Sequence, residues 1–298
     1  MFMQHKTVLL HESIDGLNLS KGNIFVDGTL GNGGHTEEVC KRFGKEVSIF
    51  AIDEDAEAIE RAKKRLSSYE NITYLKGNFR NISELIKSAG VDKVNSILLD
   101  IGLSSNQLEE SGRGFSFQKD EPLIMSFKKD LTEEDLTAKE VVNTWDLQNL
   151  TDIISGYGEE RFAWRIAKAI VRSRQIKSIE TTNELADIII SATPFFYHRR
   201  KIHPATKTFQ ALRIVVNDEI ESLKEGIIKS FDLLEKEGRL GIISFHSLED
   251  RVVKNYFRDF EKDEKGERLT KKPIIPEEAE IEENPRSRSA KLRIIKKL

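Results

Sequence analysis

The segment from residue 23 to residue 100 alternates short apolar runs with amphipathic stretches, and this alternation constrains the fold more than any other feature of the sequence. The apolar runs are rich in β-branched and aromatic residues, which favours strands. Between them, apolar residues recur at helical spacing, as Ile59, Ala62 and Leu66 do. Strands that alternate with helices predict a parallel sheet with crossover helices, and hence an α/β fold. The predicted strands are residues 24–27, 47–53, 72–76 and 96–100.

The pattern changes after Asp100, and this change predicts a second domain. Helical spacing without convincing strands continues to about Ala205. It includes one predicted helix over residues 159–174 and another that Thr182 or Asn183 would cap.

Strands return in the last third of the chain. A long predicted helix from Phe209 to Leu223 leads to strands at residues 239–245 and 290–296, and the charged residues 261–283 are predicted to form a surface loop. We therefore predict an α/β domain in two parts that encloses an inserted all-helical domain. The predicted boundaries are 1–107 and 206–298 for the α/β domain and 108–205 for the insert.

Composition narrows the class of protein. The single cysteine, Cys40, excludes an intrachain disulfide and a cysteine-rich zinc site, which fits a reducing compartment. The first residues lack the pattern of a secretory signal, and no apolar stretch reaches the roughly 18 residues of a membrane-spanning helix. We therefore expect a cytoplasmic protein with no membrane partner. The formal net charge is −3, so any binding of nucleic acid must depend on local basic patches.

A glycine-rich loop, DGTLGNGGH at residues 27–35, closes the first predicted strand and opens a helix, which places it at the ligand-binding edge of an α/β sheet. A nucleoside-triphosphate loop needs a lysine where this chain has Gly34. A dinucleotide loop needs a glycine where Thr36 stands, and Asp27 would repel a pyrophosphate. S-adenosylmethionine fits better, because it has no phosphates, Asp27 would attract its ammonium, and glycines such as Gly33 admit close backbone approach. A tight turn without a ligand is the structural alternative.

Three residues that end or follow predicted strands are further candidates. Asp53 ends the second strand, where a carboxylate can accept both ribose hydroxyls of a nucleoside or can cap the next helix. Phe79 follows the third strand and could stack on adenine or belong to the core. Asp100 ends the fourth strand and is the first candidate for catalysis, because a carboxylate there can hold an exocyclic amine whose lone pair turns toward the methyl group. Its structural alternative is to cap a turn through the serines that follow it.

The fifth predicted strand runs into the segment SFHSLED. Ser247 and Asp250 are predicted to cap a helix there. His246 is the second candidate for catalysis, since it could bond a base or a phosphate, although it could equally be a scaffold residue. The remaining histidines have no metal-ligand spacing and no H-E-x-x-H motif occurs, so we predict no catalytic metal.

Two segments carry a local excess of basic residues. Residues 159–213 hold 11 basic and 5 acidic residues, and residues 285–298 hold six basic residues and no acidic one. Such an excess is typical of phosphate contacts, and the aromatic residues nearby could stack on unpaired bases. The alternative is a solvated basic helix face over core aromatics. The aromatic residues in question are Trp164, Phe195, Phe196 and Tyr197.

Taken together, these motifs resemble the bacterial 16S ribosomal RNA cytosine-N4 methyltransferase family, of the MraW or RsmH type. The resemblance runs nearly end to end, through HKTVLLHES, DGTLGNGGH, AIDED, LLDIGLSSNQL, RGFSF, YGEERFAWRIAKAI, HPATKTFQALRIVVNDE, GRLGIISFHSLEDRVVK and NPRSRSAKLR. It implies a Rossmann-like, seven-stranded S-adenosylmethionine-dependent methyltransferase sheet with an inserted helical recognition domain. It also implies a substrate, the N4 amine of a cytosine in the decoding centre of 16S ribosomal RNA in the small ribosomal subunit.

The resemblance also implies a set of residues that bind the cofactor. They are Gly33, Gly34 and His35 in the loop, followed by Asp53, Phe79, Asp100 and Gln107.

The chain departs from the family pattern after RGFSF. The family usually reads P-L-D-M-R-M-D there, whereas this chain reads PLIMSFK at residues 122–128. Two carboxylates and an arginine are therefore missing, so contacts of this loop with cofactor or RNA are expected to differ. Trp164, where the family commonly has a basic residue, is a smaller change.

Other functions share parts of this pattern. A methyltransferase that modifies an amine of another RNA or of DNA would have the same sheet and loop. A ribosome-assembly factor would use the basic insert while its cofactor site served only the structure. A dehydrogenase is the most distant alternative, and titration with NAD and with S-adenosylmethionine separates it from the others.

Overall fold

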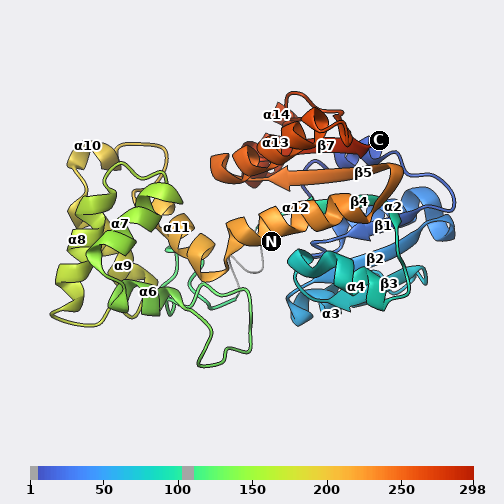
Figure 1. Ribbon diagram of the computed structural model, residues 1–298. Helices are drawn as coiled ribbons and strands as arrows, with labels where there is room; N and C mark the ends of the chain where they lie inside the picture. The colour runs from blue at the N-terminus through green and yellow to red at the C-terminus, as the bar shows by residue number, and fades with distance from the viewer. Residues whose placement is uncertain (1–5, 103–110) are drawn as a thin grey trace. The chain divides into compact units, whose positions relative to one another are not determined.

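The computed structural model describes residues 6–102 and 111–298, which fold into two compact units (Figure 1). The first unit contains the chain up to Gly102 and from Ile220 onward, and the second contains the part between them. Within the described residues, no helix has both the length and the apolar character required to cross a membrane.

The first unit is built on one seven-stranded sheet in the order β3-β2-β1-β4-β5-β7-β6. Strands β1 to β5 are parallel, and β7 runs antiparallel to both β5 and β6. This confirms the predicted α/β class. The strands are β1 (Ile24–Asp27), β2 (Ser48–Asp53), β3 (Ile72–Lys76), β4 (Val94–Asp100), β5 (Leu234–Ser244), β6 (Gly266–Arg268) and β7 (Lys291–Lys297).

Helices cover both faces of this sheet because successive side chains of a buried strand point to opposite faces. On β4, Ile97 and Leu99 pack in one apolar cluster and Leu98 packs in the other. Helices α4 (Ile82–Ser88), α12 (Glu219–Leu233) and α13 (Ser247–Lys262) contribute to the first cluster. Helices α1 (Leu10–Leu17) and α2 (Gly34–Phe43) contribute to the second, and α3 (Ala56–Arg65) packs beside β2 and β3.

One prediction for this unit was wrong. Residues 261–283, expected to be a surface loop, include the end of α13, strand β6 and helix α14 (Glu278–Glu283). Strand β6 has only three residues, and it is held by backbone pairing with β7 rather than by an apolar pattern. A strand that short has no periodicity from which it could be recognised.

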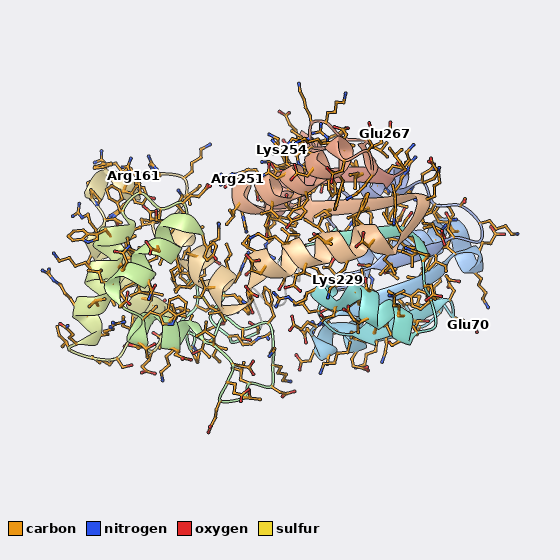
Figure 2. All side chains as sticks on the ribbon, in the orientation of Figure 1. Glu70, Arg161, Lys229, Arg251, Lys254 and Glu267 are labelled. Atoms are coloured by element: carbon orange, nitrogen blue, oxygen red, sulfur yellow. The ribbon has the colours of Figure 1, made fainter. Side chains whose placement is uncertain are left out.

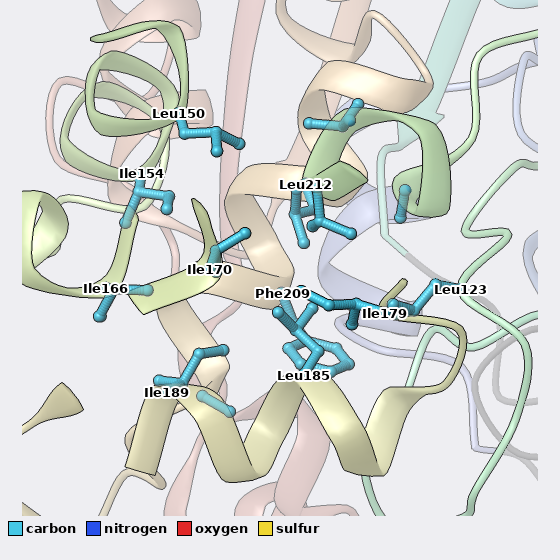
Figure 3. Packing of buried hydrophobic residues seen from close by; sticks show 14 of the residues in the cluster. Leu123, Leu150, Ile154, Ile166, Ile170, Ile179, Leu185, Ile189, Phe209 and Leu212 are labelled. Carbon is cyan, nitrogen blue, oxygen red and sulfur yellow. The ribbon is translucent and has the colours of Figure 1, made fainter. Parts of the chain in front are cut away.

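The second unit is helical, as predicted, and has its own core (Figure 3). Its helices are α6 (Ala138–Thr144), α7 (Leu147–Gly156), α8 (Ala163–Arg174), α9 (Thr182–Ala192), α10 (Phe195–His198) and α11 (Thr206–Val216). The core lies between facing apolar stripes, and Leu150, Ile170 and Leu185 are among its fully buried members.

The second unit extends past the predicted boundary at residue 205, because α11 belongs to it. Phe209 and Leu212 of α11 pack in the helical core. The predicted continuous helix from Phe209 to Leu223 is in fact two helices, separated at Asn217 and Asp218, where Asp218 has φ 48°. The Asn217 side chain is fixed by loop backbone, since it accepts from Phe127 N and donates to Met125 O, both at 2.7 Å.

Two helix starts in this unit also differ from the prediction. Helix α8 begins at Ala163 rather than at residue 159, because Glu159 has φ 48°, a left-handed conformation that cannot continue a helix. Helix α9 is capped by Thr181 rather than by Thr182 or Asn183. The hydroxyl of Thr181 accepts from Glu184 N, and the Glu184 carboxylate accepts from Thr181 N, which forms a capping box.

The atypical stretch at residues 122–128 has a structural role in the helical unit. Leu123 and Met125 are fully buried in its core. The guanidinium of Arg113 donates to the carbonyls of Ser126 and Phe127, at 3.1 and 2.8 Å. Apolar residues at these positions therefore pack the helical unit.

Candidate functional site

The glycine-rich loop lies over the carboxyl ends of β1 and β4. Gly28 N donates to Leu98 O at 2.9 Å, and Asp100 N donates to the hydroxyl of Thr29 at 2.6 Å. A Cβ on Gly28 would lie 2.3 Å from Leu99 Cδ2, so no larger residue fits there. The loop and the strand that carries Asp100 are thus held together by backbone contacts.

The loop turns into α2 through two glycines that cannot be replaced easily. Gly33 has φ 76°, which favours glycine, and Gly34 is the first residue of the helix. A Cβ on Gly34 would lie 1.8 Å from the hydroxyl oxygen of Thr7. Thr7 therefore covers the loop, a role that sequence analysis missed, although Thr7 lies within the first motif of the family resemblance.

Asp27 is directed toward the loop itself. Its carboxylate is 1 % exposed and accepts from the Thr36 hydroxyl at 2.7 Å and from Thr29 N at 3.3 Å. Burial raises the pKa of Asp27 to about 6, and the hydrogen bonds from Thr36 and Thr29 oppose the rise. Asp27 thus orders the loop and can act on a bound cation through its charge.

Asp53 links the ends of β1 and β2. One carboxylate oxygen accepts from Gly31 N and the other from Asp55 N, both at 2.8 Å. Burial raises the pKa of Asp53 to about 6, opposed by these two amides. The structural alternative, a helix cap at Asp53, is not observed, because Asp55 is the residue that caps α3.

Asp100 and His35 lie close together at the edge formed by the carboxyl ends of the strands. His35 Nδ1 lies 4.0 Å from Asp100 Oδ2. The Asp100 side chain is 23 % exposed, so a ligand can reach it, yet its Oδ1 atom is buried and has no hydrogen-bond partner among the residues that the structure describes. Burial raises the pKa of Asp100 to about 7, with smaller contributions from the charges of Asp27 and Glu249.

These carboxyl groups predict that the ligand-free protein loses stability as the pH rises from about 4 to 7. The folded pKa values of Asp27, Asp53 and Asp100 lie above that of an unfolded aspartate, so the folded state keeps protons that the unfolded chain has released. The free energy of unfolding therefore falls across this window. Asp100→Asn removes one of these carboxyl groups, so the free energy of unfolding should fall less steeply with pH, by up to about 1.4 kcal/mol per pH unit. Denaturant titrations at several pH values measure this slope. A variant curve parallel to the wild-type curve would contradict the assignment.

The two remaining candidates for cofactor binding are Phe79, which the structure describes, and Gln107. Phe79 begins the 3₁₀ turn Phe79–Asn81 and packs against the core, where its ring lies 2.5 Å from the position of a Cβ on Gly226. It is only partly buried, so a contact with adenine stays a prediction. Gln107 lies outside the described residues.

His246 caps helix α13. Its Nδ1 accepts from Glu249 N at 3.3 Å, and its Nε2 lies 3.0 Å from Glu249 Oε1. Glu249 is 2 % exposed, and its other oxygen accepts from Phe245 N and His246 N. The predicted cap by Ser247 and Asp250 was therefore wrong by one residue. The spacing of three between His246 and Glu249 is that of a capping box, a signal that could have identified Glu249 from the sequence.

The basic segment of the helical unit carries exposed aromatic rings that each contact a cation. Trp164, Phe195 and Phe196 are 53, 70 and 60 % exposed. Lys168 Nζ lies 4.5 Å from the centroid of the Trp164 ring. The guanidinium carbon of Arg199 lies 5.0 Å from the centroid of the Phe195 ring, and that of Arg161 lies 5.3 Å from the centroid of the Phe196 ring. Figure 2 labels Arg161 on this unit, next to α10. We call these three the aromatic–cation pairs.

Tyr197 differs from the other three aromatic residues. It is 4 % exposed, and its hydroxyl donates to Glu160 at 2.5 Å. Burial and the Glu160 carboxylate raise the pKa of Tyr197 to about 12. Tyr197 therefore belongs to the core, and the expectation that it could stack on a base was wrong.

Known proteins resemble this chain over its whole length. The model of the MraW methylase family matches residues 2–298. A protein of Clostridium botulinum named ribosomal RNA small subunit methyltransferase H is 44 % identical over 100 % of both chains. One of the same name from Brevibacillus brevis is 41 % identical over 99 % of this chain and 98 % of its own. A solved rRNA methylase from Streptococcus thermophilus has a TM-score of 0.46 at 14 % identity and covers 99 % of each chain.

Proposed function

Because the chain belongs to the MraW methylase family, we propose that it transfers a methyl group from S-adenosylmethionine to the N4 amine of a cytosine in the decoding centre of 16S ribosomal RNA. The relatives named ribosomal RNA small subunit methyltransferase H support this substrate. A ribosomal substrate would place the reaction in the cytoplasm. The observation that carries the proposal is the buried Oδ1 of Asp100 beside the glycine-rich loop, which has no hydrogen-bond partner in residues 6–102 and 111–298.

The residues at the loop fit S-adenosylmethionine. The glycines allow a ligand to approach the backbone, and no lysine or arginine of the loop prepares it for a pyrophosphate. With pKa values of about 6, Asp27 and Asp53 are mostly ionised at neutral pH and give the site a negative potential that suits a cation. Asp53 and the glycines would hold the nucleoside and the methionine end, with Phe79 and Gln107 as further contacts. When bound, S-adenosylmethionine supplies a methyl group on a sulfonium.

Asp100 would act on the acceptor amine. The cytosine must leave its base stack for its amine to reach the sheet edge. In its ionised form, Asp100 accepts a hydrogen bond from the amine and orients its lone pair for attack. The amine needs no strong base beforehand, because it can lose its proton after the positive charge has formed. With a pKa near 7, the Asp100 carboxyl can receive that proton. Phe245 or His246, at the end of the neighbouring strand, would position the base.

The helical unit would bind the surrounding RNA. Its basic residues suit phosphates, and each aromatic–cation pair offers a ring for an unpaired base beside a charge for its backbone.

The deciding experiment supplies labelled S-adenosylmethionine and small ribosomal subunits that lack this modification, with naked RNA and DNA in parallel. Nucleoside mass analysis should find N4-methylated cytidine in the subunit sample. Label on DNA or on another RNA alone would refute the substrate. No label despite tight binding to the subunit would favour the assembly factor.

The double variant Phe195→Ala/Phe196→Ala should bind the small subunit at least about 30 times more weakly, since two stacked bases together contribute at least about 2 kcal/mol. Each stacked base contributes about 1–3 kcal/mol, and 1.4 kcal/mol is tenfold in affinity. Ile176→Ser is the matched control, because Ile176 is 90 % exposed and contributes no ring. Equal affinities of the double variant and the control, measured at one salt concentration, would refute a stacking role.

A further inference from the structure

A cavity of about 230 Å³ lies in the first unit, between the start of α13 and the segment of residues 275–291. Figure 1 shows α13 and α14 next to β7, where this segment runs. Its lining includes Phe245, His246, Ile275, Ile281, Arg288 and Lys291. The lining is thus partly aromatic and aliphatic and partly basic. This combination suits a molecule with a flat apolar ring and an anionic group.

The two basic side chains that line the cavity, Lys291 and Arg288, differ in their ion pairing. Lys291 Nζ lies 3.1 Å from the carboxylate of Asp250, which also pairs with Arg293 at 2.7 Å. Arg288 is exposed, and within the part of the chain that the structure describes it forms neither a side-chain hydrogen bond nor an ion pair. The guanidinium of Arg288 is therefore available to an anion that enters the cavity, and it suits the paired oxygens of a phosphate.

The start of α13 does not supply the anion site by itself. The amides of Phe245 and His246 donate to the carboxylate of Glu249, and His246 Nδ1 accepts from Glu249 N. Glu249 therefore already places a negative charge at this helix end. An entering phosphate would depend on Arg288.

Phe245 lines the cavity and also lies close to the proposed methylation site. The Phe245 ring lies 2.6 Å from the position of a Cβ on Gly102, two residues after Asp100. Asp100 pairs with Ile243 on β5, and β5 in turn pairs with β7. Phe245, which lines the cavity, therefore follows the strand next to the one that ends at Asp100, and adjacent strands are about 4.8 Å apart. Ile275, which also lines the cavity, is 62 % exposed.

We propose that this cavity binds the nucleotide next to the target cytosine in single-stranded RNA, with its phosphate on Arg288 and its base between Phe245 and Ile275. The proposal rests on the proposed function, because it assigns a neighbour to the base at Asp100. It explains why an exposed isoleucine lines one cavity with an arginine that pairs with no described residue. An RNA strand held at two successive nucleotides would present the cytosine amine in a fixed orientation.

The test compares Arg288→Ala with Lys272→Ala, which removes an exposed charge just before this segment and outside the cavity. The probe is a fluorescent seven-nucleotide single-stranded RNA with a central cytosine, titrated at several salt concentrations. Arg288→Ala should weaken binding about tenfold and lower the salt dependence by about one phosphate contact. Lys272→Ala should change binding less than twofold. S-adenosylmethionine affinity should be the same in both variants.

A second variant tests the apolar part of the lining, and methyl-transfer kinetics separate this proposal from the proposed function. Ile275→Asp should weaken binding of the oligonucleotide at least as much as Arg288→Ala, since it places a charge where the base would stack. With small subunits as substrate, both variants should raise KM more than they lower kcat. Normal RNA binding by Arg288→Ala, or an equal loss in Lys272→Ala, would overturn the cavity proposal. If wild-type protein binds the oligonucleotide through Arg288 but methylates no subunit, only the proposed function fails.

Discussion

Replacing Asp100 with alanine is expected to lower kcat for methyl transfer to the small subunit by at least about 10²–10³-fold. This is the usual loss when one positioned polar group at a reaction centre is removed. The reason lies in the site: Asp100 Oδ1 is buried and has no hydrogen-bond partner in the described part of the chain, while Oδ2 belongs to a side chain that a ligand can reach. Initial rates with labelled S-adenosylmethionine measure the effect.

Two controls separate this role from a structural one. Asp100→Ala should remain folded and gain stability near pH 8, because it removes a buried carboxylate with one oxygen that no described residue hydrogen-bonds. The affinity for S-adenosylmethionine should be titrated separately, since Asp100 could serve the cofactor. Asp100→Asn keeps one acceptor oxygen and should retain more activity than Asp100→Ala. Near-normal turnover in the alanine variant would contradict the assignment.

Replacing Asp53 with alanine is expected to weaken S-adenosylmethionine binding by about 10 to 100 times. A hydrogen bond to a charged group contributes about 1.5–3 kcal/mol, and the Asp53 carboxylate would accept from the ribose of the cofactor. The same carboxylate holds the amide of Gly31, so its removal also loosens the glycine-rich loop. Calorimetric titration with S-adenosylmethionine measures the change.

Asp55→Ser is the matched control for Asp53. Asp55 caps α3 by accepting from Glu57 N at 2.9 Å, and serine preserves that cap while it removes a neighbouring charge. Its affinity for the cofactor should stay within about threefold of wild type, a change of less than 1 kcal/mol. An Asp53→Ala variant that binds as tightly as Asp55→Ser would leave Asp53 with a structural role only.

The sequence predicted the loop and the strand ends because both follow from local patterns. Each parallel strand was recognised as a short apolar run, and the carboxyl ends of neighbouring parallel strands meet at one edge. Asp27, Asp53 and Asp100 could therefore be assigned to one site before any coordinates were known. The capping role of His246 and Glu249 also has a local signal, but the adjacent Ser247 and Asp250 offered a competing pattern.

Features that depend on distant partners could not be predicted. Thr7 covers Gly34, and Asn217 ends a helix by bonding the backbone at Phe127 and Met125, about 90 residues away. The continued apolar spacing through Phe209 and Leu223 predicted one helix, because periodicity records which face is buried and not where the axis breaks.

The sequence by itself determined the α/β sheet, the glycine-rich loop, the strand-end carboxylates and the family. Each of these features follows from a pattern of neighbouring residues in the sequence. Only the tertiary structure decided the state of each group: that Oδ1 of Asp100 lacks a partner among the residues with described positions, that Tyr197 is buried while Phe196 is exposed, and that Arg288 lines a cavity with Phe245. The physical reason is that burial, pKa and pairing depend on atoms brought together from far along the chain, which no local pattern records.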